Sequence, residues 1–387
     1  MSRVIVFSHD HKFIRYNGRY FTKASFNDEV LSRYIVYGGC LKIICRLVDV
    51  ADYPDGCSEI KNQNILFFPL VNMRSVKGLF FVFINLLKTK KILMDASLVF
   101  VRLPSSVGLL TYIAAGFLKK KIIVEVVGNA LESNKLHGSG LGKVFGVVEH
   151  YFTKKFIASA SNVIYITEHY LQSIYPNLKN TVVLPNVSIT PLGNILQKKT
   201  EFDQVIRTRL IGSSDVNHKG HDTALKTTAE LKRKLPKYDF QLIFIGAGDA
   251  RRWDELIFKL SLEQNVFFQG AVKAGKSVFD LVMTMDFMLQ PSTVEAQGRS
   301  IIESMNCGVP VIATKVGGIP ELISGDFLID VNDYVRAAEI IKYFILDVSA
   351  YNDFRNDNLI KSMFFYNDRI NSNRMDYVNA ILSKEDI

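Results

Sequence analysis

Two carboxylates and a predicted helix N-terminus form the most informative segment of the chain. Glu295 lies in a polar turn after a predicted strand, and Glu303 lies just over one turn inside the helix that follows. The helix is expected to begin near Gly298, so the backbone N–H groups of Arg299 and Ser300 would be unpaired at its positive end. Such an end favours an anion such as a diphosphate. Taken alone, the pair is more often two solvent-exposed glutamates, so its surroundings must decide.

Short apolar strands and amphipathic helices alternate in the half of the chain that carries this segment. The predicted strands cover 208–212, 240–246, 266–270, 286–290 and 309–314, and the helices between them cover 222–234, 249–262, 278–283 and 299–306. Buried strands that alternate with helices indicate a parallel sheet covered on both faces.

The same alternation runs through the first half of the chain. Predicted strands cover 4–8, 43–48, 98–102, 122–127 and 163–167, with helices over 28–37, 75–87 and 107–118. This α/β pattern predicts two doubly wound, Rossmann-like domains facing a central cleft that binds the ligand. We expect the domains at 1–187 and 205–365, a linker over 188–204, and a C-terminal helix over 366–387 that crosses back to the first domain.

Several motifs of the second half, taken together, resemble the family-4 retaining glycosyltransferases of GT-B fold, the group 1 glycosyl transferases. Two glutamates with seven residues between them precede Gly308-Val309-Pro310-Val311-Ile312-Ala313 and the turn Gly317-Gly318-Ile319-Pro320-Glu321. Upstream, Lys219-Gly220-His221-Asp222 is similar to the family's K-G-x-D helix start, and Gly246-Ala247-Gly248 is similar to its G-x-G turn. The resemblance covers residues 205–330.

This resemblance implies roles for individual residues. Glu303 would bind the ribose hydroxyls of a nucleotide sugar, Glu295 would contact the transferred sugar, and Lys219 would neutralise the diphosphate leaving group. A fixed ammonium and helix N–H groups stabilise the negative charge that develops on such a leaving group. The other implied donor-binding residues are Gly298, Arg299, Ser300, Gly246 and Gly248.

The chain departs from the family pattern at two positions. Ser213 stands where the family usually has an arginine six residues before the lysine, and Gln297 stands where many members have phenylalanine. Either Arg299 or another basic group replaces the missing arginine, or the diphosphate is stabilised less strongly. The neighbours of the lysine, His218 and His221, are expected to be solvated loop residues.

The implied activity is the transfer of a sugar from a UDP- or GDP-linked donor to a hydroxyl acceptor, with retention at the anomeric carbon. We expect the acceptor to be a lipid-linked or other saccharide in the biosynthesis of a bacterial surface polysaccharide, such as O-antigen, capsule or lipopolysaccharide. No cofactor and no metal are expected. The alternatives are a GT-B phosphorylase, a sugar-nucleotide epimerase or, outside enzymes, a basic α/β module that docks on membranes or nucleic acid.

A polar and aromatic loop is expected after the first strand, from His9 to Tyr20. The pair His9 and Asp10 could act on the acceptor hydroxyl as a catalytic base. A capped turn with surface histidines explains them equally well. Asn17 and Gly18 of the same loop are expected at the acceptor cleft, because open α/β sheets bind ligands at the carboxyl ends of their strands.

Three more residues of the first half are expected to face this cleft. Arg102 lies at the end of the strand over 98–102, and Gly128 and Asn129 follow the strand over 122–127. Arg102 either binds a phosphate or caps a helix, and the sequence does not choose between these roles.

Positive charge is concentrated in the first half. The chain carries a net charge of +9, whereas residues 1–190, with 23 Lys and Arg against 12 Asp and Glu, carry +11. Lysines gather beside apolar helical stretches at Lys88, Lys90, Lys91, Lys119, Lys120, Lys121, Lys154 and Lys155. This pattern suits an anionic membrane surface as well as a solvated face. No nucleic-acid recognition motif accompanies it, so nucleic acid is not an expected partner.

Composition and cysteine spacing exclude several other classes of protein. The hydrophobic fraction of 48% and charged fraction of 22% are those of a globular chain. Four cysteines without C-x-x-C or ligand spacing argue against a disulfide scaffold and against zinc. No signal peptide and no apolar run of about 20 residues is visible, so we expect a cytoplasmic protein, peripheral on the inner face of the plasma membrane.

Overall fold

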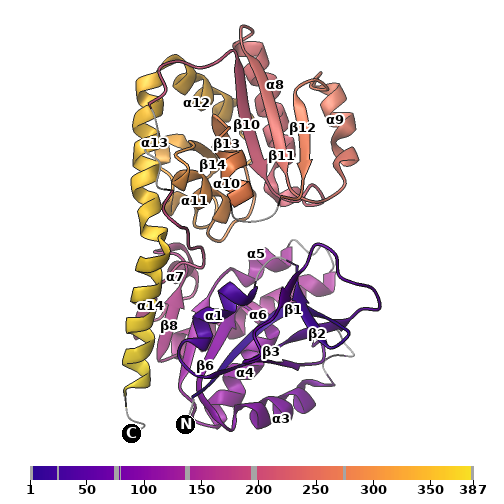
Figure 1. Ribbon diagram of the computed structural model, residues 1–387, viewed down its shortest axis with the longest axis vertical. Coiled ribbons are helices and arrows are strands. Elements are labelled where there is room, and N and C mark those ends of the chain that lie inside the picture. The colour runs from indigo at the N-terminus through magenta and orange to yellow at the C-terminus, as the bar shows by residue number, and fades with distance from the viewer. Residues whose placement is uncertain are drawn as a thin grey trace. The chain divides into compact units, whose positions relative to one another are not determined.

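The computed structural model describes residues 3–23, 26–73, 78, 80–135, 140–192, 198–272 and 276–384. The chain forms two compact units, which are coloured from indigo to yellow along the sequence (Figure 1). Unit 1 consists of Met1–Asn186 and Asn371–Ile387, and unit 2 consists of Val187–Ile370. The start of the predicted helix over 75–87 and part of the predicted linker lie outside the described residues.

Unit 1 is built on a mostly parallel sheet. Parallel strands run in the order β5-β3-β1-β6-β7-β8-β9, and β2 and β4 extend β1 as antiparallel strands. The strands are β1 (Val4–Tyr16), β2 (Arg19–Thr22), β3 (Cys40–Asp49), β4 (Ser58–Ile60), β5 (Ile65–Pro69), β6 (Ala96–Leu103), β7 (Ile122–Val126), β8 (Asn162–Tyr165) and β9 (Asn180–Val183). The central strands β6 and β7 are buried almost continuously, as expected of parallel strands covered on both faces.

The first strand differs from its prediction. β1 does not end at Ser8 but continues through His9 and Asp10 to Tyr16, so the expected loop is wrong. The turn that follows consists of Asn17 and Gly18, whose φ angles are 46° and 75°. Two successive residues with positive φ match the right-handed twist of a hairpin, and Asn-Gly is the preferred pair for them. Asn17 and Gly18 therefore form the tip of the β1–β2 hairpin, not a loop at the carboxyl end of a short strand.

Helices cover the sheet of unit 1. They are α1 (Asp28–Ile35), α3 (Val82–Leu93), α4 (Ser106–Phe117), α5 (Ala130–Lys135), α6 (Gly140–Ser159) and α7 (Tyr170–Ile174). Side chains cap the starts of two of them: Asn27 accepts from the Val30 N–H at 3.0 Å, and Ser105 accepts from the Gly108 N–H at 2.9 Å. Such caps satisfy N–H groups that have no acceptor inside the helix. No described helix has the length and apolar composition of a membrane span.

Unit 2 contains a parallel sheet in the order β12-β11-β10-β13-β14-β15. The strands are β10 (Val205–Ile211), β11 (Asp239–Ile245), β12 (Val266–Gly270), β13 (Phe287–Gln290), β14 (Val311–Thr314) and β15 (Leu328–Ile329). The helices are α8 (His221–Lys234), α9 (Asp254–Lys259), α10 (Lys276–Val282), α11 (Arg299–Asn306), α12 (Tyr334–Leu346) and α13 (Val348–Ser362), with 3-10 turns at Asn217–Lys219, Ala250–Trp253, Ile319–Glu321 and Gly325–Phe327. The predicted helix over 249–262 is thus a 3-10 turn followed by the short α9.

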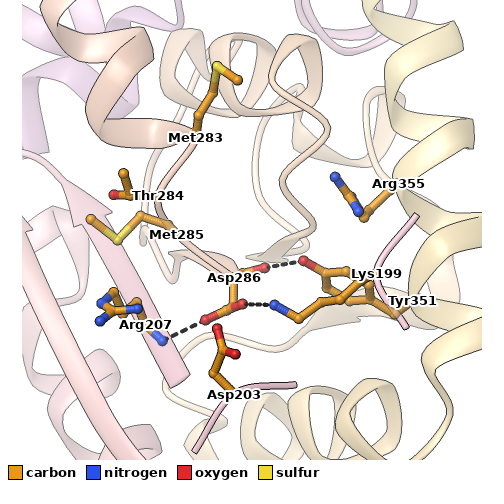
Figure 2. Close-up of a pocket in the computed structure, with 9 residues that line it drawn as sticks. All are labelled: Lys199, Asp203, Arg207, Met283, Thr284, Met285, Asp286, Tyr351 and Arg355. Atoms are coloured by element: carbon orange, nitrogen blue, oxygen red, sulfur yellow. Dashed lines mark hydrogen bonds and ion pairs between the residues drawn. The ribbon is translucent and has the colours of Figure 1, made fainter. Parts of the chain in front are cut away.

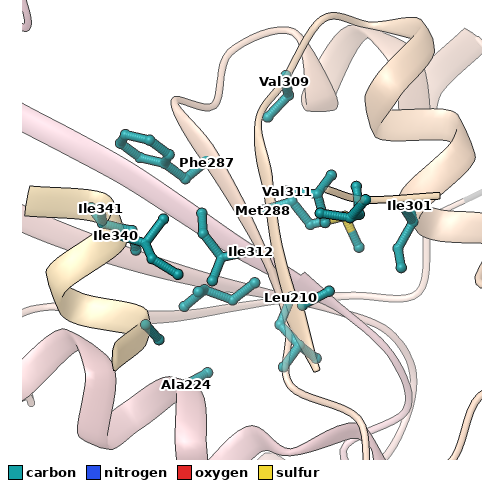
Figure 3. Packing of buried hydrophobic residues seen from close by; sticks show 14 of the residues in the cluster. Leu210, Ala224, Phe287, Met288, Ile301, Val309, Val311, Ile312, Ile340 and Ile341 are labelled. Atoms are coloured by element: carbon teal, nitrogen blue, oxygen red, sulfur yellow. The ribbon is translucent and has the colours of Figure 1, made fainter. Parts of the chain in front are cut away.

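The core of unit 2 lies between its sheet and the helices. Phe287 and Met288 of β13 and Ile312 of β14 are fully buried, and Ile301 of α11 and Ile341 of α12 pack into the same cluster (Figure 3). All four residues of β13 and of β14 are buried. Because both faces of these strands are covered, the loops at their ends are held on a rigid support.

The helix α14 (Asn367–Leu382) connects unit 2 to the last part of unit 1. Its Arg374 Nη1 lies 2.9 Å from Glu125 Oε1 of β7, and the two side chains are 3% and 1% exposed. The Tyr34 hydroxyl donates to the other Glu125 oxygen at 2.8 Å. Val378 and Ile381 of α14 join the core of unit 1. A buried ion pair and apolar packing therefore fix the end of the chain to unit 1.

Candidate functional site

The sheet of unit 2 changes its winding direction between β10 and β13. From β10 the chain winds through β11 to β12, and from β13 it winds the other way through β14 to β15. β10 and β13 are parallel neighbours, so the loops over 212–220 and 291–298 leave the same edge of the sheet side by side. Ligands of open α/β sheets bind at such a switch point, outside the carboxyl ends of the strands.

These two loops bring Lys219 and Glu295 together. Lys219 Nζ lies 2.7 Å from Glu295 Oε2, and the two side chains are 22% and 17% exposed. The loops are also joined by a backbone hydrogen bond from the Thr293 N–H to the His218 carbonyl, at 2.9 Å. Gly220 makes this approach possible, because a Cβ there would lie 2.0 Å from the Pro291 carbonyl oxygen. The ion pair is therefore positioned by backbone, at the mouth of the switch point.

The N-terminus of α11 lies at the end of the second loop. Gly298 has a φ of 86° and precedes Arg299, the first residue of the helix. The Ile301 and Ile302 N–H groups are bonded to the Gly298 carbonyl, so the N–H groups before them have no acceptor in the helix. The Ser300 hydroxyl donates to Gln290 Oε1 at 2.9 Å. Ser300 thus anchors the helix to β13 with its side chain, and its backbone N–H is the group suited to an anion.

Glu303 lies on α11 and is partly buried. Burial raises the pKa of its carboxyl group, and the guanidinium groups of Arg299 and Arg209 oppose this shift. No side chain or backbone group of the described residues forms a hydrogen bond with this carboxylate. A half-buried carboxylate whose oxygens accept no hydrogen bond from these residues is suited to bind hydroxyl groups of a ligand.

Arg209 is a residue of this region that sequence reasoning missed. It lies on β10, is completely buried, and donates through Nη2 to Ser304 of α11. Its Nε and Nη1 atoms have no hydrogen-bond partner among the described residues, and burial lowers its pKa to about 10. A charged residue inside a predicted apolar strand was the signal that could have found it. Its charge compensates for the cost of burying Glu303 nearby.

The glycine turn after β11 supports the first loop. The Ser214 N–H donates to the Ala247 carbonyl at 2.8 Å, and a Cβ on Gly246 would lie 2.1 Å from the Gly212 oxygen. A Cβ on Gly248 would lie 2.8 Å from the Asp215 backbone nitrogen. Gly246 and Gly248 are therefore placed where they shape the loop that carries Lys219.

The position of the missing arginine is part of this same loop. Ser213 Oγ accepts from the Asp215 N–H at 3.3 Å. Arg252 approaches the loop from the 3-10 turn after β11 and donates to the Ser214 carbonyl at 3.2 Å and to Asn217. Arg252 is thus a second cation, beside Arg299, that adjoins the segment expected to bind the diphosphate.

The two histidines beside Lys219 have different surroundings. His221 is completely buried and stacks on Trp253, with ring centroids 5.2 Å apart, so the expectation of a solvated residue is wrong for it. Burial lowers the pKa of His221 to about 4. His218 is partly exposed, and its pKa is also lowered by burial. Both rings are neutral at pH 7 and add no positive charge to the site.

In unit 1, Asp10 is engaged in a structural contact. Its carboxylate accepts from the Ser106 N–H, the Ser106 hydroxyl and the Val107 N–H, each at 2.9 Å, and so caps α4 together with Ser105. His9 lies beside the Phe26 ring. Burial and Arg102 lower the pKa of His11 to about 4. The capped-turn explanation therefore accounts for Asp10, and nothing in these contacts requires it to be a base.

The other predicted cleft residues of unit 1 also have local partners. Arg102 Nη1 lies 3.9 Å from Glu125 Oε2, and its guanidinium carbon lies 5.0 Å from the centroid of the Phe26 ring. Asn129 Oδ1 accepts from the Leu131 N–H at 3.1 Å at the start of α5. A Cβ on Gly128, which precedes Asn129, would lie 3.9 Å from Pro104, an ordinary contact distance, so the packing there does not require a glycine. The structure thus gives Arg102 and Asn129 roles in stabilising unit 1.

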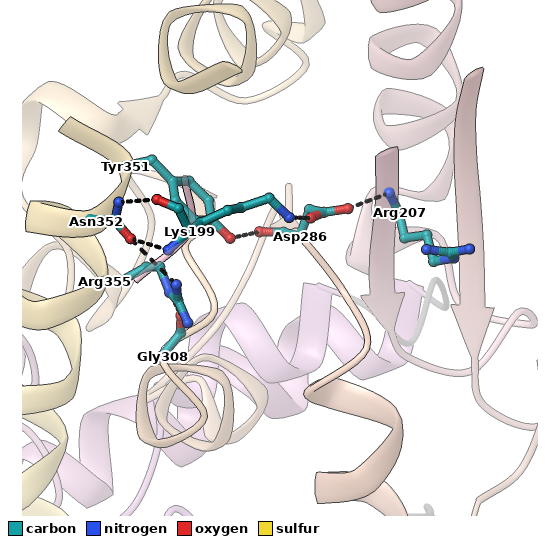
Figure 4. Close-up of polar contacts among 7 residues, drawn as sticks. All are labelled: Lys199, Arg207, Asp286, Gly308, Tyr351, Asn352 and Arg355. Atoms are coloured by element: carbon teal, nitrogen blue, oxygen red, sulfur yellow. Dashed lines mark hydrogen bonds and ion pairs between the residues drawn. The ribbon is translucent and has the colours of Figure 1, made fainter. Parts of the chain in front are cut away.

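A polar pocket of about 300 Å³ lies at the opposite edge of the sheet of unit 2 (Figure 2). Asp286, just before β13, accepts from Lys199 Nζ at 2.6 Å and from the Arg207 N–H at 2.9 Å. The Tyr351 hydroxyl of α13 donates to the Asp286 carbonyl at 3.1 Å, and Asn352 bonds both backbone groups of Lys199 (Figure 4). These contacts attach the segment before β10 to α13, so we interpret this pocket as structural.

Within the described ranges, no group of three His, Cys, Asp or Glu side chains is placed to hold a metal ion. The four cysteines Cys40, Cys45, Cys57 and Cys307 are free thiols. Two of them, Cys45 and Cys307, are buried, and burial raises the pKa of each thiol to about 12.

Comparison with known proteins identifies relatives of both units. The family model described as Glycosyl transferases group 1 matches residues 208–347. The chain is 28% identical over 360 residues to Protein CapJ of Staphylococcus aureus, covering 92% of this chain and 89% of CapJ. It is 29% identical over 152 residues to lipopolysaccharide glucosyltransferase WaaG of Escherichia coli K12, covering 39% of this chain and 38% of WaaG.

Solved structures show the same fold. HepE of Anabaena, determined in complex with UDP, has a TM-score of 0.69 at 15% identity and covers 98% of this chain and 100% of HepE. The crystal structure of WaaG has a TM-score of 0.65 at 13% identity, with 98% and 100% coverage. With the switch-point geometry of unit 2, these matches show that the chain has the GT-B fold and that residues 208–347 are similar to the group 1 glycosyl transferases.

Proposed function

We propose that unit 2 binds a nucleotide-sugar donor at its switch point and that the chain transfers the sugar to a hydroxyl acceptor. The observation that carries this proposal is the meeting of Lys219 and Glu295, from two different loops, beside the α11 N-terminus and Glu303. A cation and unpaired N–H groups suit a diphosphate, and carboxylates suit the hydroxyl groups of a ribose and a sugar. The site therefore offers each part of a nucleotide sugar a group that complements it.

In the proposed reaction, the bond between the anomeric carbon and the diphosphate oxygen breaks, and the acceptor oxygen bonds to that carbon. The nucleoside diphosphate leaves with the bonding electrons, so negative charge grows on it in the transition state. Lys219 and the N–H groups at the start of α11 stabilise this charge. Following the family, we propose that the configuration at the anomeric carbon is retained and that neither a metal nor a cofactor takes part.

The ion pair at the site has a consequence for donor binding. Without a donor, Lys219 and Glu295 neutralise each other at 2.7 Å. A diphosphate would compete for the Lys219 ammonium, because two negative oxygens interact with it more strongly than one carboxylate does. Glu295 would then be released to accept hydrogen bonds from the sugar. Binding of the diphosphate to Lys219 would thus make Glu295 available to bind the sugar.

We propose UDP or GDP as the nucleotide and a lipid-linked or other saccharide of a bacterial surface polysaccharide as the acceptor. The HepE structure with bound UDP supports UDP, and the name of WaaG, a lipopolysaccharide glucosyltransferase, supports the acceptor class. The relationship to glycosyltransferases disfavours the phosphorylase, the epimerase and the non-enzymatic docking module.

The test combines nucleotide binding with turnover of nucleotide sugars. Titration calorimetry with UDP, GDP, ADP and CMP should reveal one preferred nucleotide, and its sugar derivatives are then assayed for nucleotide release. Glu295→Gln should reduce turnover without weakening binding of the free nucleotide, because Glu295 is assigned to the sugar and its carboxylate no longer competes with the diphosphate for Lys219. Glu263→Gln, at an exposed position of the same unit, is the matched control. Loss of nucleotide binding in Glu295→Gln would overturn this assignment.

A further inference from the structure

Three helices of unit 1 expose large apolar side chains. Phe83 and Leu87 of α3 are 68% and 52% exposed, Phe117 of α4 is 66% exposed, and Val144 and Tyr151 of α6 are 62% and 60% exposed. Phe83 and Leu87 are four residues apart and so share one face of α3. Single exposed apolar residues are ordinary, but a set gathered on neighbouring helices indicates a binding surface.

The three helices form one continuous surface. An apolar groove of about 250 Å³ is lined by residues of all three, among them Val82 of α3, Ile113 of α4 and Phe152 of α6. Lys90 of α3 lies over the Phe117 ring of α4, with its Nζ 4.2 Å from the centroid. We call the exposed side of α3, α4 and α6 the docking face.

The charge of the docking face is positive. The three helices carry described lysine side chains at Lys88, Lys90, Lys91, Lys154 and Lys155, whereas their one acidic residue, Glu149, is buried with 8% of its surface exposed. Lys119, Lys120 and Lys121 follow directly after α4. Lys88 and Lys91 also line a second hollow of about 400 Å³, together with Lys42. Apolar side chains are thus accompanied by cations and by almost no anions.

We infer that unit 1 binds the surface of an anionic lipid bilayer through the docking face. Exposed Phe, Leu and Val side chains would enter the boundary between headgroups and acyl chains, and the lysines would face anionic headgroups. A second copy of the chain fits poorly, because a symmetric contact would place lysines against lysines. Nucleic acid would explain the lysines but not the exposed aliphatic groove. The inference does not depend on the transfer reaction, and either can fail without the other.

Flotation with vesicles tests the inference on the full chain. At low salt the protein should float with vesicles of phosphatidylcholine and phosphatidylglycerol, and not with phosphatidylcholine alone. Binding should weaken as NaCl rises, because the screening length falls to about 8 Å at physiological ionic strength. A protein that ignores anionic vesicles at low salt would overturn the inference, while a cooperative thermal unfolding transition would show that the protein is folded.

Two variants separate the apolar from the electrostatic contribution. Phe83→Ser with Leu87→Ser should weaken vesicle binding by at least about tenfold, since each side chain would lose its burial in lipid. Lys154→Gln with Lys155→Gln should weaken it by roughly 25-fold, or about fivefold for each lysine. The matched control is Phe258→Ser with Lys259→Gln, which removes an exposed aromatic residue and a lysine from unit 2 and should leave binding unchanged.

A fluorescent reporter distinguishes insertion from adsorption. The chain contains one tryptophan, Trp253 of unit 2, which is buried. In Phe83→Trp, anionic vesicles should shift the added emission to the blue, and brominated acyl chains should quench it. Binding without either change would mean that another surface holds the lipid. If Phe83→Ser with Leu87→Ser instead abolishes a dimer seen by ultracentrifugation and leaves vesicle binding intact, the face is a self-association surface and the inference is wrong.

Discussion

The polar residues at the carboxyl ends of the two sheets serve different purposes. In unit 2, Lys219 and Glu295 meet at the switch point with part of each side chain exposed, and Glu303 keeps its acceptor positions. In unit 1, the corresponding side chains already accept hydrogen bonds from the protein backbone: Asp10 caps α4, and Asn129 caps α5. Polar groups near the carboxyl ends of neighbouring strands are therefore proposed to bind the donor in unit 2, whereas in unit 1 they cap helices.

A position at the end of a strand therefore does not by itself establish a binding role. What distinguishes unit 2 is that its polar groups are left partly unsatisfied by the protein. A carboxylate that already accepts three hydrogen bonds, as Asp10 does, has little capacity to bind or deprotonate a ligand. Residues that keep donors or acceptors available are the better candidates for chemistry.

The largest expected effect concerns the buried ion pair of unit 1. Arg374→Ala leaves Glu125 charged and unpaired in the interior, which should lower the free energy of unfolding by about 3–5 kcal/mol. Urea unfolding followed by circular dichroism measures this change. Arg369→Ala, at an exposed position of the same helix, should cost less than about 1 kcal/mol, because it loses only a surface contact with Phe364.

A double variant sharpens this prediction. Arg374→Met with Glu125→Leu removes both charges, so most of the lost stability should return. If the double variant is as unstable as Arg374→Ala, packing and not the unpaired charge causes the loss. Nucleotide binding by unit 2 should survive in each of these variants, since Arg374 belongs to unit 1.

The next effect concerns the ion pair of unit 2. Lys219→Ala should lower the rate of sugar transfer by about 10²–10³-fold, because it removes charge stabilisation that grows in the transition state. Its cost in stability should stay below about 1 kcal/mol, as for other partly exposed pairs. Lys226→Ala on α8 is the control, and its rate should match that of the wild type. A stable Lys219→Ala protein with a normal rate would mean that the pair is only structural.

The smallest effect is expected at Asp10. Asp10→Ala should destabilise the protein by about 1 kcal/mol through the loss of a helix cap, with turnover nearly unchanged. Asp10→Asn, which keeps an acceptor oxygen, should be closer to the wild type in stability. A general base would behave differently, since its removal lowers turnover by about 10²–10⁴-fold. Such a loss without unfolding would restore the catalytic role that the sequence suggested.

The sequence predicted the helix that carries Glu303 with the correct bounds, from Arg299 to Asn306. Apolar periodicity and a glycine at the helix start are local signals. The structure agrees with them because α11 packs its apolar residues against β13 and β14, which are buried on both faces. The length of β1 was missed, because the polar run that begins at His9 interrupts its apolar pattern. The Asn17-Gly18 pair is typical of a two-residue β-hairpin turn and indicates that the strand continues up to it.

Other features depend on partners that are distant in the chain. The contact between Asp10 and the start of α4 spans 96 residues, and that between Arg374 and Glu125 spans 249. No local pattern indicates which polar residue another segment will occupy. The pairing of Lys219 with Glu295 was likewise unpredicted, although both residues were expected at the donor site. Sequence motifs identified the groups, and only the sheet order of unit 2 explains why they meet.

The most direct test of the donor site is the affinity of the free nucleotide for wild-type protein and for Glu303→Ala, measured by titration calorimetry. UDP or GDP should bind the wild type, and Glu303→Ala should lose about 1–3 kcal/mol of binding free energy, because ribose hydroxyls lose a partner in a half-buried site. Glu263→Ala should bind as the wild type does. Equal affinity in folded Glu303→Ala would contradict the assignment of Glu303 to the ribose, and no nucleotide binding by the wild type would contradict the donor site in unit 2.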